Sequence, residues 1–224
     1  MQAENFAQVA SQHQPMLGHA PHCGDGVWTC WHAQGLFGLL CDGAGHGPEA
    51  EQIQQQAIDV ARRMIETSDG SEAASEIDLV ALFHALHQQL KGSRGMVAVA
   101  FVLHADGGVD FIHIGDVSLY CFQDTFAQLG RSNEQQGIIG YHMPTPRVQH
   151  WQCEPGQWLL SHSDGIHRST APEAWQRLLQ HGRSMSTVSL NIMRELADGR
   201  DDASCIVVRY WGKRQMVSLR ESKI

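Results

Sequence analysis

Acidic residues placed at the ends of apolar, strand-like runs constrain this chain most strongly. Asp42 and Asp164 each end such a run, and each is followed by a glycine. The pair Asp201-Asp202 directly precedes a third run, and Asp25 lies in a fourth acidic segment near the N-terminus. A carboxylate at the end of a buried strand is costly to bury unless a positive partner neutralises it. Several such carboxylates predict an oxygen-ligand site for hard divalent cations, and therefore an enzyme.

Length, composition and charge exclude several classes of protein. The chain has 224 residues, 42% hydrophobic and 18% charged, which is ordinary for a soluble globular protein. The formal net charge of −8 and the lack of a basic stripe argue against a nucleic-acid partner. No apolar run approaches the roughly 18 residues of a membrane span, and the N-terminus lacks the features of a signal peptide. The six cysteines contain no C-x-x-C pair, so we expect reduced thiols, no zinc site and a cytoplasmic location.

Hydrophobic periodicity predicts an α+β protein. The sequence contains no repeat and no linker, so we expect a single domain over residues 1–224, with its core at about 23–210. We expect strands at 27–33, 36–41, 96–104, 109–114, 117–122 and 203–210, a hairpin around 154–156, and helices at 48–67, from Ser75 to Leu90, at 172–181 and at 186–197. This order suits a packed pair of antiparallel sheets covered by helices.

Five segments resemble, in the same order, the motifs of the metal-dependent protein phosphatase family (PPM, or protein phosphatase 2C). They are Leu-Leu-Cys-Asp-Gly-Ala-Gly-His-Gly at 39–47, Arg-Gly-Met-Val-Ala at 94–98, His-Ile-Gly-Asp-Val-Ser at 113–118, Ser-Asp-Gly at 163–165 and Asp-Asp-Ala-Ser at 201–204. Cys-Gly-Asp-Gly at 23–26 is similar to a segment of the compact bacterial phosphatases of partner-switching stress and sporulation circuits. The resemblance implies an αββα sandwich of two antiparallel sheets flanked by helices.

The resemblance also implies a centre of two Mn²⁺ or Mg²⁺ ions. It places the bridging carboxylate, which holds the attacking water, at Asp42, with the backbone carbonyl of Gly43 as a further ligand. Asp164 and Asp201 would hold one metal, and Asp25 would serve the other, directly or through water. Taken singly, each Asp-Gly pair is also a common turn dipeptide, so the order of the motifs carries the interpretation.

Three further residues are candidates on weaker grounds. Some family members place a histidine directly after the Asp-Gly pair as a proposed general acid, but this chain has Ala44 there and His46 two residues later. Protonation of the leaving group would then fall to water or to His46. Arg94 is a candidate phosphate-binding residue, since a guanidinium can bind phosphate through two hydrogen bonds. Asp116 either contributes to the site or only forms a turn between strands.

We therefore expect a serine/threonine protein phosphatase that uses metal-activated water on a phosphorylated regulatory protein, such as an anti-sigma-factor antagonist. One alternative is a catalytically weak or inactive regulator that binds partner proteins on the same fold. Another is a phosphatase of small metabolites. Metal titration would distinguish the inactive regulator, and a comparison of phosphopeptide with phosphometabolite would distinguish the third interpretation.

Overall fold

The computed structural model describes residues 6–66, 76–123, 128–166, 172–181 and 184–212. It contains two five-stranded antiparallel sheets. The first sheet has the order β2-β3-β4-β5-β8, with β2 at Asp25–His32, β3 at Gly35–Gly43, β4 at Met96–His104, β5 at Gly108–Ile114 and β8 at Gln149–Gln152. The second sheet has the order β1-β10-β9-β6-β7, with β1 at Ala7–Gln14, β10 at Ala203–Tyr210, β9 at Trp158–His162, β6 at Ser118–Phe122 and β7 at Gln128–Arg131.

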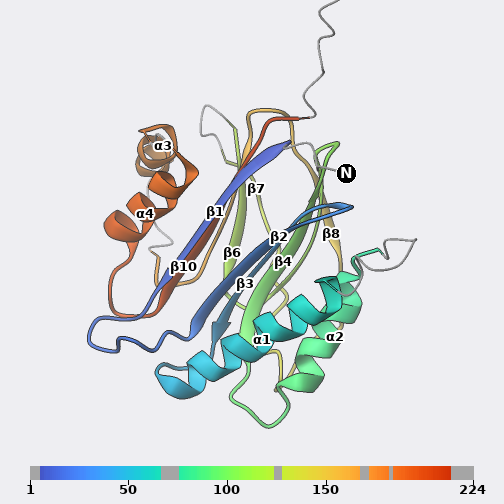
Figure 1. Ribbon diagram of the computed structural model, residues 1–224, viewed down its shortest axis with the longest axis vertical. Helices are drawn as coiled ribbons and strands as arrows, with labels where there is room; N and C mark the ends of the chain where they lie inside the picture. The colour runs from blue at the N-terminus through green and yellow to red at the C-terminus, as the bar shows by residue number, and fades with distance from the viewer. Residues whose placement is uncertain (1–5, 67–75, 124–127, 167–171, 182–183, 213–224) are drawn as a thin grey trace, which may run out of the picture.

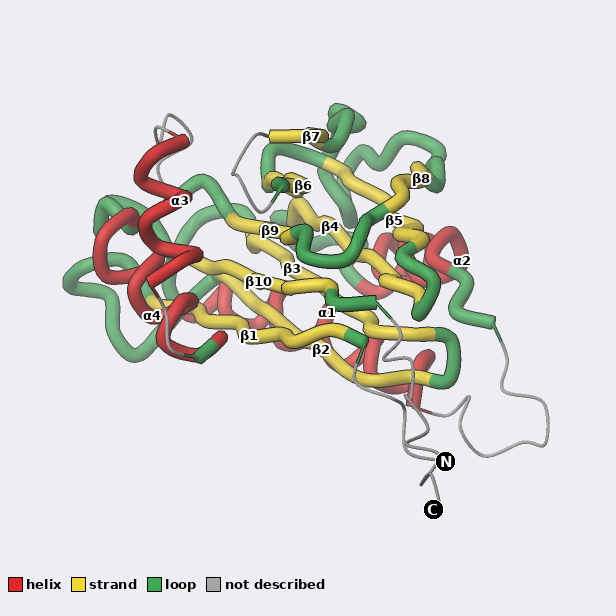
Figure 2. Tube along the Cα trace, turned by 90° about the horizontal axis from the view of Figure 1, so that it is seen from above, coloured by secondary structure: helices red, strands yellow, loops and turns green. Residues whose placement is uncertain are grey.

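Helices cover the outer face of each sheet (Figure 1). Helices α1 (Pro48–Glu66) and α2 (Leu79–Gln89) pack on the first sheet. Helices α3 (Pro172–His181) and α4 (Met185–Leu196) pack on the second sheet. Figure 2 shows the resulting order of helices, sheet, sheet and helices from a second direction. The expected α+β fold with an αββα sandwich is therefore confirmed. None of the helices in the described stretches is both long and apolar enough to cross a membrane.

The alternation of side chains along each central strand builds this four-layer order. On β3, Phe37 and Leu39 face the helices, whereas Leu36 and Leu40 face the second sheet. All four side chains are fully buried. Both faces of such a strand are apolar, which is why the sequence shows continuous apolar runs instead of an alternating pattern. Asp42 is therefore the first charged position at the end of this apolar run.

Two strands were absent from the sequence-based expectation. Strand β1 forms an edge of the second sheet and pairs with β10 from Ala7 to Gln14. Its sequence, Ala-Gln-Val-Ala-Ser-Gln-His-Gln, is largely polar because most of its side chains are only half-buried. Strand β7 has four residues and forms the other edge. Edge strands need little apolar surface, so hydrophobic patterning detects them poorly.

The expected hairpin around 154–156 is wrong. Strand β8, which contains Trp151, pairs with β5 in the first sheet, whereas β9, which begins at Trp158, pairs with β10 and β6 in the second. The Glu154-Pro155-Gly156 segment therefore crosses from one sheet to the other. The start of α2 also differs from the expectation. Asp78 caps this helix by accepting the N–H of Ala81, and Ser75 lies outside the described residues.

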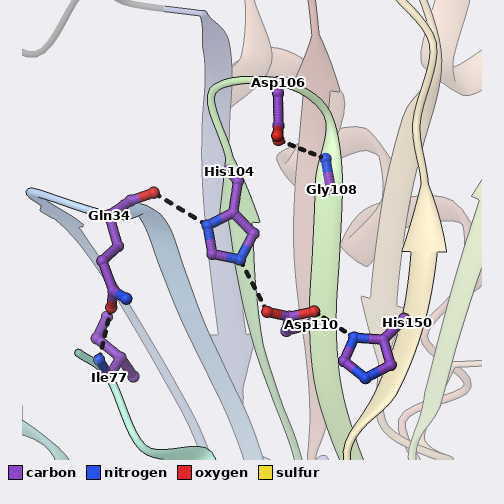
Figure 3. A network of polar contacts seen from close by, with 7 residues as sticks. All are labelled: Gln34, Ile77, His104, Asp106, Gly108, Asp110 and His150. Atoms are coloured by element: carbon purple, nitrogen blue, oxygen red, sulfur yellow. Dashed lines mark hydrogen bonds and ion pairs between the residues drawn. The ribbon is translucent and has the colours of Figure 1, made fainter.

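A polar network joins the strand connections at one end of the first sheet (Figure 3). The two nitrogens of the His104 ring contact the carbonyl of Gln34 and the carboxylate of Asp110, at 3.2 and 2.9 Å. Asp110 also contacts His150 on β8 at 2.5 Å. The β3–β4 register pairs His104 with Gly35 at the start of β3, so this network lies at the opposite end of the sheet from Asp42.

Candidate metal centre

Four of the acidic residues line one cavity of about 330 Å³ at the end of the sandwich. They are Asp42, Asp116, Asp164 and Asp201. Asp42 comes from the end of β3 in the first sheet, and Asp116 from the β5–β6 connection. Asp164 follows β9, and Asp201 precedes β10, both in the second sheet. Carboxylates distant in sequence therefore meet because the strand ends of both sheets open onto the same side.

Asp25 is not among the described residues that line this cavity. It stands directly opposite Asp42 in the register of β2 and β3. Its side chain is fully buried, and neither carboxylate oxygen has a hydrogen-bond partner of normal geometry among the described residues. A buried acceptor without a donor is costly, so the apo structure carries an uncompensated group at this point.

The cluster shifts the pKa values of both residues upward. Burial raises the pKa of Asp25 to about 7, helped by Asp202 and Asp164 and opposed by the nearby hydroxyls of Ser163 and Ser204. Burial also raises the pKa of Asp42 to about 9, and the charges of four further carboxylates add to the rise. Those four carboxylates belong to Asp25, Asp164, Asp201 and Asp116. Cations in the cavity would reverse these shifts, because an adjacent positive charge favours the ionised form.

The donor set fits hard divalent cations. It consists of several carboxylates that repel one another, which is the oxygen-only chemistry that Mg²⁺ and Mn²⁺ prefer, and Arg200 lines the same cavity. Among the described residues, no three histidine, cysteine, aspartate or glutamate side chains converge closely enough to form a ready-made metal cluster. The backbone brings the acidic strand ends together, and the remaining approach is a matter of side-chain adjustment.

The backbone after Asp42 is fixed by close contacts. The N–H of Gly43 donates to the carbonyl of Gly24 at 3.1 Å, and the N–H of Ala44 donates to the carbonyl of Gly95 at 2.9 Å. A Cβ atom at residue 43 would lie 2.8 Å from the carbonyl oxygen of Ala50 on α1. Only glycine allows helix α1 to begin so close to the strand end.

His46 and Arg94 occupy different places. His46 is exposed and lines the acidic cavity, and its ring contacts the edge of His19 at 4.6 Å between centroids. Arg94 is not one of the described residues that line this cavity. It forms an ion pair of 2.5 Å with Glu49. It also lines a separate groove between α1 and the segment before β4. The ion pair uses one terminal nitrogen of the guanidinium, and the other terminal nitrogen lies beside Gly45, which lines the acidic cavity.

The structure decides one open candidate and adds one residue that was not expected at the site. Asp116, which the sequence left open between a site residue and a turn, lines the cavity with Asp42. The Gly-Asp-Val-Ser motif that contains it was the available signal, although a turn was the competing interpretation. Asp202 is buried and accepts two backbone hydrogen bonds, whereas only its neighbour Asp201 was expected to take part. Its position one residue before a fully buried strand was the only sign of this role.

The fold is the one shared by the PP2C-type phosphatases. The family model described as Stage II sporulation protein E (SpoIIE) matches residues 33–211. The chain belongs to this family, and the expected resemblance to the partner-switching phosphatases is confirmed. The matched segment contains Asp42, Asp164 and Asp201 and begins after Asp25.

Solved structures share the fold over almost the whole chain. A chain from the bacterial stressosome, described as a modular system adapted to control secondary messenger signalling, is 25% identical with a TM-score of 0.76, and the match covers 91% of this chain and 99% of that one. RsbX in complex with magnesium is 16% identical, with a TM-score of 0.73 and coverage of 93% and 97%. The catalytic domain of the phosphatase PstP with two manganese ions is 17% identical, with a TM-score of 0.68 and coverage of 92% and 98%. A search of curated proteins found no match.

Proposed function

We propose that this chain is a Mn²⁺- or Mg²⁺-dependent serine/threonine protein phosphatase and that it acts as one domain. The observation that carries the proposal is the cavity in which Asp42, Asp164 and Asp201 meet at the end of the sandwich. These three residues belong to separate motifs that lie within the family match. Magnesium and manganese in the RsbX and PstP structures support the choice of metals for a shared fold.

In this proposal, Asp42, Asp164, Asp201 and the carbonyl of Gly43 hold two ions, and Asp25 serves one of them, directly or through water. When bound, two divalent ions neutralise phosphoryl oxygens and make hydroxide available near neutral pH. The acidic residues also exclude an unmetallated phosphate from the cavity, because like charges repel at short range. His46 stands at the cavity rim, where it could hold the proton that the leaving alkoxide requires.

Exposed apolar side chains near the cavity support a protein substrate over a small metabolite. Ile138 lines the cavity and is 36% exposed, and Tyr141, whose N–H donates to the carbonyl of Ile138, is 78% exposed. Leu17 follows the cavity residue Met16 and is 80% exposed. Apolar groups clustered near a polar site are typical of protein-binding surfaces. We infer a phosphorylated regulatory protein as the substrate, such as an anti-sigma-factor antagonist, in line with the stressosome origin of a similar chain.

A catalytically weak regulator is the second candidate. Ala44 replaces the histidine that some family members use as a proposed general acid. This replacement favours slow turnover. It leaves protein binding on the same surface intact.

Hydrolysis of p-nitrophenyl phosphate with Mn²⁺, with Mg²⁺ and with chelator tests the proposal. Asp42→Ala should lower the metal-dependent rate by more than about 100-fold, since even residues that only support metal ligands typically cost 10–100-fold. Asp106→Ala is the matched control, because Asp106 caps a turn at the far end of the first sheet by accepting the N–H of Gly108. No turnover by folded wild-type protein at any metal concentration would favour the inactive regulator.

A further inference from the structure

We propose that Asp202 is a positioning residue that holds the four predicted metal-ligand segments in register across the two sheets. This inference rests on the proposed function. Asp202 is 3% exposed and does not line the acidic cavity. Its role is therefore to hold the backbone that carries the ligands, and it contacts no reacting group.

The Asp202 carboxylate binds both ends of the β1–β2 connection. One oxygen accepts the N–H of Met16 at 2.7 Å, and the other accepts the N–H of Gly24 at 2.6 Å. Met16 lines the cavity, and Gly24 directly precedes Asp25. Both contacts are long-range, since they join residues 186 and 178 positions apart. One side chain of the second sheet thus fixes where β2 of the first sheet begins.

The contact with Gly24 continues to Asp42. The carbonyl of Gly24 accepts the N–H of Gly43 at 3.1 Å, so a single residue links the Asp202 carboxylate to the segment after Asp42. Charge-assisted hydrogen bonds are shorter and stronger than neutral ones, and bonds in sequence polarise one another. A change in the Asp202 carboxylate is therefore transmitted to both Asp25 and Asp42.

The remaining two ligand segments meet the backbone of Asp202. The N–H of Asp202 donates to the carboxylate of Asp201 at 2.9 Å, which orients that predicted ligand. A Cβ atom at Gly165, the residue after Asp164, would lie 2.1 Å from the carbonyl oxygen of Asp202. The Asp164-Gly165 turn is therefore packed directly against residue 202. The segments of Asp164 and Asp201 thus contact Asp202 itself, and those of Asp25 and Asp42 are joined to it through Gly24.

The geometry requires an acceptor at both oxygens. Asn at position 202 would keep the shape of the side chain but would present an NH₂ group to one of the two N–H donors. One bond is then lost and two donors face each other, which leaves a buried group unsatisfied. Since Gly24 is itself buried and a Cβ there would lie 2.7 Å from the Cβ of Ala50, the segment has little room to find another arrangement.

The test compares Asp202→Asn with Asp78→Asn and wild type. Asp78 also accepts a backbone N–H, that of Ala81 at 2.9 Å, but it caps α2 away from the acidic cavity. Mn²⁺ binding is measured by isothermal titration calorimetry. Hydrogen exchange of the 16–24 segment is followed by mass spectrometry in the presence of chelator. We expect Asp202→Asn to bind Mn²⁺ about 10–100-fold more weakly, the usual effect of losing a residue that supports ligands, and to exchange this segment faster.

Asp78→Asn should change neither measurement. In turnover assays, Asp202→Asn should raise the Mn²⁺ concentration for half-maximal rate more than it lowers kcat at saturating Mn²⁺. Unchanged Mn²⁺ affinity and exchange in Asp202→Asn, or an equal loss in Asp78→Asn, would overturn the inference while leaving the phosphatase proposal intact. Failure of wild type itself to bind Mn²⁺ would overturn both. If Asp202→Asn does not fold, Asp202→Glu is measured in its place, because it keeps the charge but displaces both oxygens by one methylene.

Discussion

Replacing Asp25 with asparagine should stabilise the metal-free protein and change how its stability depends on pH. The Asp25 side chain is fully buried, and no described group donates to its oxygens with normal hydrogen-bond geometry. Burial raises its pKa from 3.8 to about 7, and the nearby hydroxyls of Ser163 and Ser204 offset this rise only in part. A folded-state pKa above the unfolded value means that the folded state holds its proton more tightly. The apo protein is therefore destabilised as the pH rises from the unfolded pKa towards the folded one.

The size of the effect follows from this pH window. Below about pH 4 both states are protonated, and above about pH 7 both are ionised, so the loss of stability accumulates between these limits. Each pH unit within the window costs about 1.4 kcal/mol. Between pH 5 and pH 8, the free energy of unfolding of the metal-free wild type should therefore fall by about 3 kcal/mol through Asp25. Asp25→Asn should not show this fall, because asparagine does not ionise. Removal of the Asp25 charge should also lower the pKa of Asp42, because repulsion from Asp25 contributes to its rise.

Urea unfolding in chelator at pH 5 and pH 8 measures the effect for both proteins. Groups that do not interact with Asp25 cancel in the comparison, whereas the titration of Asp42 is itself changed by the substitution. A difference in pH dependence below about 1 kcal/mol would refute the reasoning, since it would mean that Asp25 is not strained in the folded apo state. Repeating the measurement with Mn²⁺ should reverse the order of stability, because a bound cation stabilises the ionised carboxylate of wild type and binds the asparagine variant less well.

Two further substitutions test the packing and the substrate surface. Phe101, 1% exposed between the sheets, has its ring where a Cβ at Gly38 would approach to 2.3 Å, so Phe101→Ala should destabilise the protein by about 3–5 kcal/mol in urea unfolding. A loss below about 1 kcal/mol would contradict the packing between the sheets. Tyr141→Ala should leave stability within about 0.5 kcal/mol, because the side chain is 78% exposed. It should lower kcat/KM for a phosphoprotein while leaving p-nitrophenyl phosphate turnover unchanged, and equal losses on both substrates would exclude a role in protein recognition.

The central strands could be predicted from the sequence because they are buried on both faces. Strands β4 and β10 were placed at their observed bounds, 96–104 and 203–210. Edge strands gave no such signal: the half-buried, polar β1 escaped notice although it pairs with β10 over eight residues. The turn at Glu154-Pro155-Gly156 was identified, but a turn signal does not say whether the next strand returns to the same sheet. Here the buried Trp158 begins a strand of the second sheet instead.

The candidate site was predictable for a different reason. Motif order indicated Asp42, Asp164 and Asp201, and the structure brings these three residues to one cavity. Their roles as ligands remain predictions. The same motifs gave no information on contacts between segments, so Arg94, which pairs with Glu49 and lines a separate groove, could not be distinguished from a residue of the cavity.

Asp202 shows why such contacts escape sequence reasoning. Its partners Met16 and Gly24 are backbone N–H groups, and every residue except proline has one. Nothing in the side chains of residues 16 and 24 therefore indicates that a carboxylate 186 and 178 positions later binds them. The placement of ligands that come from both sheets depends on how the sheets face each other, and a buried acceptor that bridges them fixes this more directly than apolar packing does. The acidic strand ends supply the charges of the site, whereas their relative positions depend on residues such as Asp202 that do not line the cavity.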